Sequence, residues 1–334
     1  MKTNFLSKYS FAFCLFFVIV QQAFSQTPKS YLGYYSLINQ AEMLTFENKN
    51  EQALQKYLEA FKQYDGFEED YSKAVKLALK QPNAELTFNL LKEKALKTGW
   101  FTDELFDKNK IDSFTQTKLG KLYLENKENW FEQNKKSYDL YAYGLTKSID
   151  AIDQFVRTNF LRSSKNNFIN DSLKNVTFYN ILNETDNKNF VRFKDFVSNY
   201  GFPGKSKLGG KTLHISTFIT HIFKYGDILD SNCSKFDKEK FYYLDSLLKI
   251  QVINGEYRCN DFAYCFDYSL GNDSISYYAY PRYTFNESNK RVLINYPVID
   301  PQNLNKRRAE IGLMSIEDQC KIYGVPLPPN YKSN

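Results

Sequence analysis

The titratable side chains that could do chemistry lie mostly in the second half of this 334-residue chain. Its only two histidines are His214 and His221, within the helical pattern KTLHISTFITHIFKYGD. Seven residues correspond to about 10.5 Å of helix rise, so one metal ion cannot bind both. A zinc protease would need histidines four residues apart with a glutamate between them. We predict no metal, and His221 is either a general base or a packed histidine.

A carboxylate that could orient such a base lies upstream, in YGLTKSIDAIDQFVRTNF. Asp153 and Arg157 are one turn apart there, and Gln154 follows the carboxylate. Taken alone, an exposed pair of this kind contributes only about 0.3–0.5 kcal/mol and is most simply a surface pair. We expect the helix to begin near Tyr143, with Asp153 at the edge of its apolar stripe. That stripe comprises Leu145, Ile149, Ile152, Val156 and Phe160.

Two adjacent arginines, Arg307 and Arg308, lie in DPQNLNKRRAEIGL near the C-terminus. Asp300 is a good helix N-cap, with a proline at the first helical position and a glycine after the end. At 100° per residue, both arginines flank the apolar stripe. A partly buried guanidinium needs a bidentate carboxylate or an anionic ligand. Asp153, Asp267 and Asp300 are the candidate partners, so we predict an inward clamp onto the Asp153 helix.

The elements that must position these residues are mostly helical. From Tyr31 to about Gly99 the pattern is helical hairpins whose small residues resemble tetratricopeptide repeats. Pro82 to Ala84 is the expected turn between helices, Gly99 the expected stop, and residues 112–130 a single capping helix. Further helices follow, separated by a polar linker near residues 163–188. Tyr, Thr, Val and Ile on both sides of Asn286–Asn289 predict one β-hairpin.

These patterns give a mainly α (α+β) fold class with four segments. Residues 1–25 are a predicted signal peptide, because two lysines precede an apolar run that ends in Ala23-Phe24-Ser25. The ten-residue run is too short to span a bilayer. Residues 26–135 form the tetratricopeptide-like region, 140–325 the mostly helical domain with the hairpin, and 326–334 a tail. We expect an exported protein, periplasmic or secreted, without a membrane span after cleavage.

Composition excludes some partners. The net charge of +6 is mild and no basic block is sustained, so we expect no nucleic-acid partner. The loop PGKSKLGG lacks the spacing of a phosphate-binding motif and follows no strand, and we predict no cofactor. After signal cleavage four cysteines remain, Cys233, Cys259, Cys265 and Cys320. They are structural bridges or buried thiols, and the sequence does not rank their pairings.

The order of motifs from residue 140 to about 325 resembles the bacterial family called domain of unknown function 6624. The resemblance rests on Asp153-Gln154 with Arg157, then YGFP with Gly209, His221, Asn254-Gly255-Glu256, FAYCFD and DPQNLNKRRAEIGL. Similar repeats often precede this domain in exported Bacteroidetes-type proteins. The resemblance implies that Asp153, Gln154, Arg157, His221, Asp267, Asp300 and Arg308 fall on the family's polar motif positions.

This chain departs from the family at two places. Tyr268 stands where the family usually has arginine, and YYAYPRY, residues 277–283, replaces a Tyr-Gly-Thr-Gln-like turn. If those groups belong to a site, this member has a lost or altered activity. The family carries no established chemistry that can be transferred.

Three functions fit these residues. We favour a binding module that grips a peptide, glycan or small anionic ligand, with Arg307, Arg308, Arg157, Gln154 and Asp300 as binding candidates. The second is a hydrolase-type enzyme in which His221 is the general base, oriented by Asp153 or Asp267, with Arg308 stabilising negative charge. The third is a structural protein whose polar residues form an internal salt-bridge network.

Overall fold

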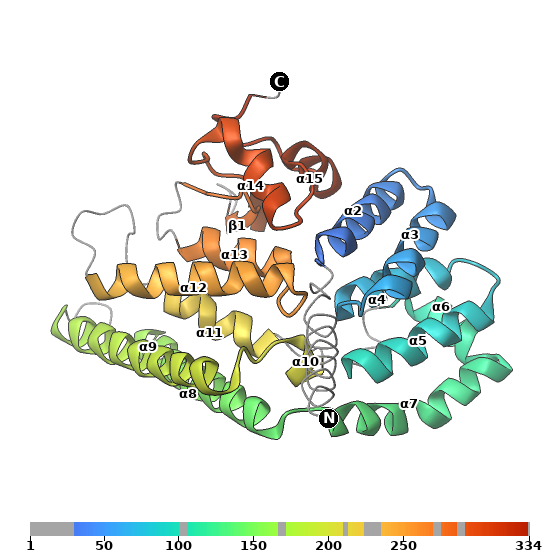
Figure 1. The fold of residues 1–334 in the computed structure, drawn as a ribbon, viewed down its shortest axis with the longest axis horizontal. Helices are drawn as coiled ribbons and strands as arrows, with labels where there is room; N and C mark the ends of the chain where they lie inside the picture. Colours follow the sequence, from blue (N-terminus) through green and yellow to red (C-terminus); the bar gives the residue numbers. More distant parts are fainter. Residues whose placement is uncertain are drawn as a thin grey trace, which may run out of the picture.

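A computed structural model describes residues 30–99, 106–165, 172–209, 213–223, 235–269, 275–285 and 291–332 (Figure 1). These residues form a mainly α-helical fold with one short pair of strands, which confirms the predicted fold class. The candidate signal peptide lies outside the described residues. Within the described ranges, no helix combines the length and the apolar character needed to cross a membrane.

The N-terminal half consists of antiparallel helical hairpins, as predicted. The predicted turn at residues 82–84 carries the expected signals: the Asn83 side chain accepts a hydrogen bond from the Leu86 amide at 2.9 Å, and Gly99 ends the helix that follows with φ of 62°. The predicted single capping helix is wrong, because Thr117 ends one helix in an extended conformation and caps the next. The helices are α2 (Leu32–Phe46), α3 (Asn50–Gln63), α4 (Glu68–Ala78), α5 (Ala84–Thr98), α6 (Lys108–Gln116) and α7 (Lys118–Lys136).

The second half continues with two long helices, which are followed along the chain by four shorter ones. Helix α11 is central, since it contacts α8, α9 and α13. Figure 1 shows α8 and α9 side by side at the opposite end of the molecule from α2 and α3. The elements are α8 (Leu140–Lys165), α9 (Ser172–Tyr200), α10 (Lys205–Leu208), α11 (Leu213–Phe223), α12 (Lys235–Ile253) and α13 (Cys259–Ser269).

Two predictions about α8 and α9 are wrong. Helix α8 begins at Leu140, before Tyr143, because the Asp139 side chain accepts hydrogen bonds from two amides of its first turn. Residues 172–188, predicted as part of a linker, belong to α9. The polar composition of that stretch was misleading because Asp186 lies on its buried face, 2% exposed.

The C-terminal cap holds the predicted β-hairpin, with β1 (Arg282–Phe285) antiparallel to β2 (Arg291–Ile294). A 3-10 turn (η3, Pro301–Asn303) leads into α14 (Leu304–Glu310), and α15 (Ile316–Tyr323) follows. Asp300 occupies the N-cap position of η3 with Pro301 directly after it, as predicted, but it does not cap in the usual way. Its backbone is left-handed, with φ of 47°, and its side chain caps no helix amide.

Helix α2 joins the two halves. The Tyr31 amide donates to the Ile253 carbonyl at 2.8 Å, and the Tyr35 hydroxyl donates to the Tyr257 carbonyl at 3.0 Å. Gly255 permits this contact in two ways: its φ is 74°, and a Cβ there would lie 2.3 Å from the Tyr31 ring. Gly255, which follows the end of α12, therefore lies where the two halves touch.

A buried charged group reinforces the same joint. Asp70, 1% exposed, accepts a hydrogen bond from the Tyr34 hydroxyl at 2.7 Å and pairs with Arg258 at 3.2 Å. Arg258 also contacts Glu69. Burial raises the pKa of Asp70 to about 6, although Lys73 and the Tyr34 hydroxyl oppose that shift. Sequence reasoning missed this pair because Asp70 and Arg258 are 188 positions apart and so form no local motif.

Candidate functional site: a histidine–aspartate pair and a groove

His221 and Asp153 meet across the α8–α11 contact. The imidazole Nδ1 lies 2.7 Å from Oδ2 of Asp153, and the His221 side chain is 21% exposed. A carboxylate at Nδ1 fixes the tautomer and leaves Nε2 to accept a proton. Among the two aspartates proposed to orient His221, the structure places Asp153 in contact with it. The side chain of His214 lies outside the described residues.

Asp153 is buried on α8, 2% exposed, and does not lie at the edge of the helix's apolar stripe as predicted. The stripe itself was misplaced: Ile149 is buried, whereas Ile152 is 42% exposed. Arg157 Nε donates to Oδ1 of Asp153 at 2.9 Å, and Gln154 Nε2 donates to Oδ2 at 2.8 Å. Burial acts to raise the pKa of Asp153, but contacts with His221 and Arg157 outweigh it and the pKa is lowered.

A second carboxylate, Asp186 on α9, completes the cluster. One terminal nitrogen of the Arg157 guanidinium lies 2.8 and 2.9 Å from its two carboxylate oxygens. Asp186 is 2% exposed, and burial raises its pKa to about 6 against the opposing charge of Arg157. Sequence analysis missed Asp186 because it lay in the presumed linker. The helical spacing of apolar residues through 172–200 could have indicated that this segment is a helix.

Asp267 does not join this cluster. Its carboxylate accepts hydrogen bonds from the Ser276 hydroxyl and from the amides of Tyr277, Tyr278 and Tyr280. Asp267 is 0% exposed; burial raises its pKa, and the hydroxyl and amide donors partly offset that shift. These hydrogen bonds hold residues 276–280 against the end of α13. The proposed orientation of His221 by Asp267 is wrong.

Arg308 is fully buried but binds no carboxylate. Its Nε donates to the Met314 carbonyl at 2.8 Å, its Nη2 donates to Gln319 Oε1 at 2.6 Å, and its Nη1 donates to the Tyr278 carbonyl. Burial lowers its pKa to about 10, although Asp267 and other groups oppose the shift. A guanidinium presents five N–H donors in a planar fork, which suits acceptors in three directions. Arg308 fastens α14 to α15 and to residue 278, and not to the Asp153 helix.

Arg307 binds one of the predicted partners. Its Nη1 lies 2.9 Å from the Asp300 carbonyl and 3.3 Å from Oδ2 of the same residue. Its Nη2 donates to the carbonyls of Tyr277 and Ile299, and its guanidinium lies 4.5 Å from the centre of the Tyr277 ring. Both arginines therefore point inward, as the helix arithmetic predicted. Their acceptors are mostly backbone carbonyls of the C-terminal cap, so the clamp onto α8 was wrong.

The structure thus divides the predicted polar set into two groups. Asp153, Gln154, Arg157 and His221 lie together at the junction of α8, α9 and α11, whereas Asp267, Asp300, Arg307 and Arg308 lie in the C-terminal cap. The first group retains partial exposure at His221 and Arg157. The second is bound to backbone groups and holds the cap together.

The buried cysteines are poor candidates for nucleophiles. Cys259, Cys265 and Cys320 are free thiols, which is one of the two predicted states, and Cys233 lies outside the described residues. Burial raises the pKa of Cys259 and of Cys265 to about 12, so neither forms a thiolate near neutral pH. In the part of the chain that the structure describes, no group of three or more His, Cys, Asp and Glu is placed to hold a metal ion.

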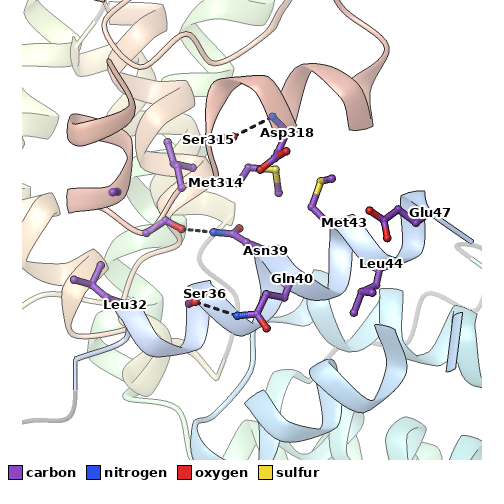
Figure 2. A pocket seen from close by; sticks show the side chains of 13 residues that line it. Leu32, Ser36, Asn39, Gln40, Met43, Leu44, Glu47, Met314, Ser315 and Asp318 are labelled. Atoms are coloured by element: carbon purple, nitrogen blue, oxygen red, sulfur yellow. Dashed lines mark hydrogen bonds between the residues drawn. The ribbon is translucent and has the colours of Figure 1, made fainter. Parts of the chain in front are cut away.

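A groove of about 560 Å³ lies where α2 meets the corner between α14 and α15 (Figure 2). One wall is the outer face of α2 and the other is the segment from Ala309 to Asp318. The Asn39 side chain donates to the Gly312 carbonyl at 2.9 Å and closes the floor between the walls. Figure 2 shows Met43 and Met314 reaching into the space from opposite sides. Sequence reasoning missed this groove because its walls are about 270 residues apart.

No protein-family model, no curated protein and no solved structure matches this chain. The resemblance to domain of unknown function 6624 accordingly stays a proposal, and the function rests on the geometry described above.

Proposed function

We propose that this protein is a binding module that holds a short peptide segment in the groove between α2 and the α14–α15 corner. The observation that carries this proposal is the groove itself, about 560 Å³, formed jointly by α2 and the α14–α15 corner. Ligand sites commonly fall between about 300 and 1,000 Å³ and occur where two parts of a chain meet. From the signal pattern of residues 1–25, we propose that binding takes place outside the cytoplasm.

The chemistry of the walls favours a peptide with apolar side chains. Leu32, Leu44, Met43 and Met314 supply apolar surface, and flexible methionines adapt to ligands of different shape. Polar groups are interleaved with them, namely Ser36, Asn39, Gln40 and Ser315. Such groups can hydrogen-bond to a peptide backbone while apolar residues fill the groove. Two carboxylates also line the groove, and each already has a lysine partner: Glu47 pairs with Lys49 at 2.7 Å, and Asp318 pairs with Lys321 at 3.7 Å.

A test of this proposal is panning of a random dodecapeptide phage library on residues 26–334, followed by fluorescence polarisation with the enriched peptides. Ser36 is an exposed groove residue on α2, so Ser36→Trp fills the groove without disturbing the core. We expect this variant to weaken binding at least tenfold. The matched control is Gln55→Trp, an exposed position on α3 outside the groove, which should bind like the unmodified protein. Enriched peptides that bind both variants equally would contradict the proposal.

A hydrolase is the second candidate, and the contact between His221 and Asp153 favours it. A buried carboxylate at Nδ1 is how many enzymes orient a histidine that takes a proton from water. Arg157 donates to both Asp153 and Asp186, and so helps to hold the carboxylate that orients His221. This candidate requires a substrate to approach the exposed part of the His221 ring.

Fluorogenic peptide, ester and glycoside substrates would test the hydrolase candidate. Activity that falls at least a hundredfold in His221→Gln, with the thermal unfolding midpoint unchanged, would support it. Activity that persists in His221→Gln would exclude His221 as the base.

A further inference from the structure

We propose that a second groove, between the start of α8 and the end of α9, is a binding site for a neutral oligosaccharide. This groove of about 560 Å³ is separate from the peptide groove and from the His221 cluster. Helix α8 contributes Tyr141, Gly144 and Ser148, and helix α9 contributes Arg192, Asp195, Asn199 and Tyr200. The inference does not depend on the proposed peptide binding.

Two large aromatic rings stand open to solvent in this groove. Tyr141 is 57% exposed and Tyr200 is 55% exposed, and their ring centres lie 5.0 Å apart. Phe196, buried below them, lies 5.5 Å from Tyr141 and 5.3 Å from Tyr200. The cluster fixes the rings in place while leaving apolar surface uncovered. Exposed, rigid tyrosines offer an apolar face with a polar tip, which suits the apolar face of a pyranose ring.

Planar polar side chains lie beside the rings. Arg192 donates to the Ser148 hydroxyl at 2.8 Å, which orients the guanidinium and leaves further N–H donors for a ligand. No hydrogen bond or ion pair between described residues engages the carboxylate of Asp195. The Asn199 side-chain amide donates one hydrogen bond to the Asp195 carbonyl of its own helix, which leaves its Oδ1 as an acceptor for a ligand. Guanidinium, carboxylate and amide together form a set of donors and acceptors that matches vicinal hydroxyl groups.

The balance of charge in the groove favours a neutral ligand. Arg192 and Asp195 are the two oppositely charged residues among those that line it. Their charges cancel, and the ammonium of Lys207, which lies 5.7 Å from the centre of the Phe196 ring, already donates to the Tyr200 carbonyl. A neutral sugar, which is recognised by hydrogen bonds and by stacking, fits this arrangement better than a phosphate or a basic peptide.

Gly144 supplies the space for such a ligand. It lies within α8, where glycine weakens the helix relative to alanine. Neither backbone nor packing requires it: its φ is not positive, and a Cβ built there meets nothing within 4 Å. What glycine provides at this position is room, because a side chain there would project into the open groove lined by the tyrosines.

The experiment is isothermal titration calorimetry of residues 26–334 with four soluble hexasaccharides: cello-, chito-, malto- and laminarihexaose. We expect at least one of them to bind, and we expect Gly144→Leu and Tyr141→Ala each to weaken that binding at least tenfold. Because Gly144→Leu replaces a helix-interior glycine, its melting temperature should not fall. The matched control is Tyr242→Ala on α12, a tyrosine that is 63% exposed outside the groove. It should bind as tightly as the unmodified protein.

Three outcomes would overturn the proposal. The first is that none of the four sugars binds at 5 mM. The second is that Gly144→Leu binds as well as the unmodified protein. The third comes from sedimentation velocity on both proteins: if the unmodified protein self-associates and Gly144→Leu does not, this face is an interface between copies of the chain.

Discussion

The imidazole Nδ1 of His221 lies 2.7 Å from Oδ2 of Asp153, a carboxylate that is 2% exposed and that also accepts hydrogen bonds from Arg157 and Gln154. One buried anion therefore orients two cationic or potentially cationic side chains. Of the residues in this cluster, Asp153 should therefore be the one whose substitution most lowers the free energy of unfolding.

Asp153→Asn should lower the free energy of unfolding by about 2–4 kcal/mol. The substitution removes the charge that pairs with Arg157 and places an amide donor against His221 or Arg157, which also donate. Urea titration at pH 7 measures the change. Thr158→Ala, on the exposed side of the same helix, should stay within about 0.5 kcal/mol of the unmodified protein. A cluster without structural importance would give the two variants equal stabilities.

Stability should fall as pH rises from about 4 to 6. Asp186 has a folded-state pKa of about 6, raised by burial, whereas an unfolded aspartate titrates near 3.9. In this window the folded protein binds more protons than the unfolded chain, so raising the pH favours unfolding. Asp70 has a similar raised pKa and acts in the same direction.

The variant Asp186→Asn separates the contribution of Asp186 to the pH dependence of stability from that of Asp70. It should remove on the order of 2 kcal/mol of that pH dependence and leave the part due to Asp70. The measurement is urea unfolding at half-unit steps from pH 4 to 7. Superimposable slopes for the variant and the unmodified protein would show that Asp186 titrates in its ordinary range.

Much of the fold followed from helix period, caps and stops. Asn83 and Gly99 marked helix ends correctly because capping depends on neighbours within a few residues. The β-hairpin followed from its local composition. Residues 172–188 were mistaken for a linker because Asp186 is polar yet buried, and its partner Arg157 is 29 residues away.

The candidate site was predicted less completely. Helix geometry showed that Arg307 and Arg308 point inward, but it could not show which acceptors they meet. Arg308 binds the Met314 and Tyr278 carbonyls, and carbonyls are present at every position, so no sequence pattern distinguishes the two that are used. The grooves depend on contacts between distant segments, and single-sequence reasoning had no signal for them.

Substitution of Arg308 should destabilise the folded protein. Arg308→Met leaves two carbonyls and the Gln319 side chain without their donor, and we expect a loss of about 3–5 kcal/mol in the free energy of unfolding. Arg308→Lys should rescue only part of this loss, because one ammonium cannot reach acceptors in three directions. Chemical denaturation provides the measurement.

Lys306 on the same helix is exposed, and Lys306→Met is the matched control, with an expected change within about 0.5 kcal/mol. If Arg308→Lys were as stable as the unmodified protein, the three-way contact would not be what holds the cap.

Lys205 should make stability rise with pH above about 8. Its Nζ donates to the Tyr31 hydroxyl at 2.9 Å and to the Asp65 carbonyl at 2.5 Å, and it lies 4.7 Å from the centres of the Tyr31 and Phe67 rings. Burial lowers its pKa to about 8, against the opposing charge of Asp65. Above pH 8 the unfolded chain keeps this proton while the folded protein releases it, so rising pH favours the folded state.

The test compares Lys205→Met with the unmodified protein by urea unfolding between pH 7.5 and 9.5. The stability of the unmodified protein relative to the variant should increase by on the order of 2 kcal/mol across this range. The same comparison with Lys62→Met, at an exposed position on α3, should show no such increase. Parallel curves for Lys205→Met and the unmodified protein would mean that Lys205 stays charged at the joint between the two halves, held there by Asp65 and by the faces of the Tyr31 and Phe67 rings.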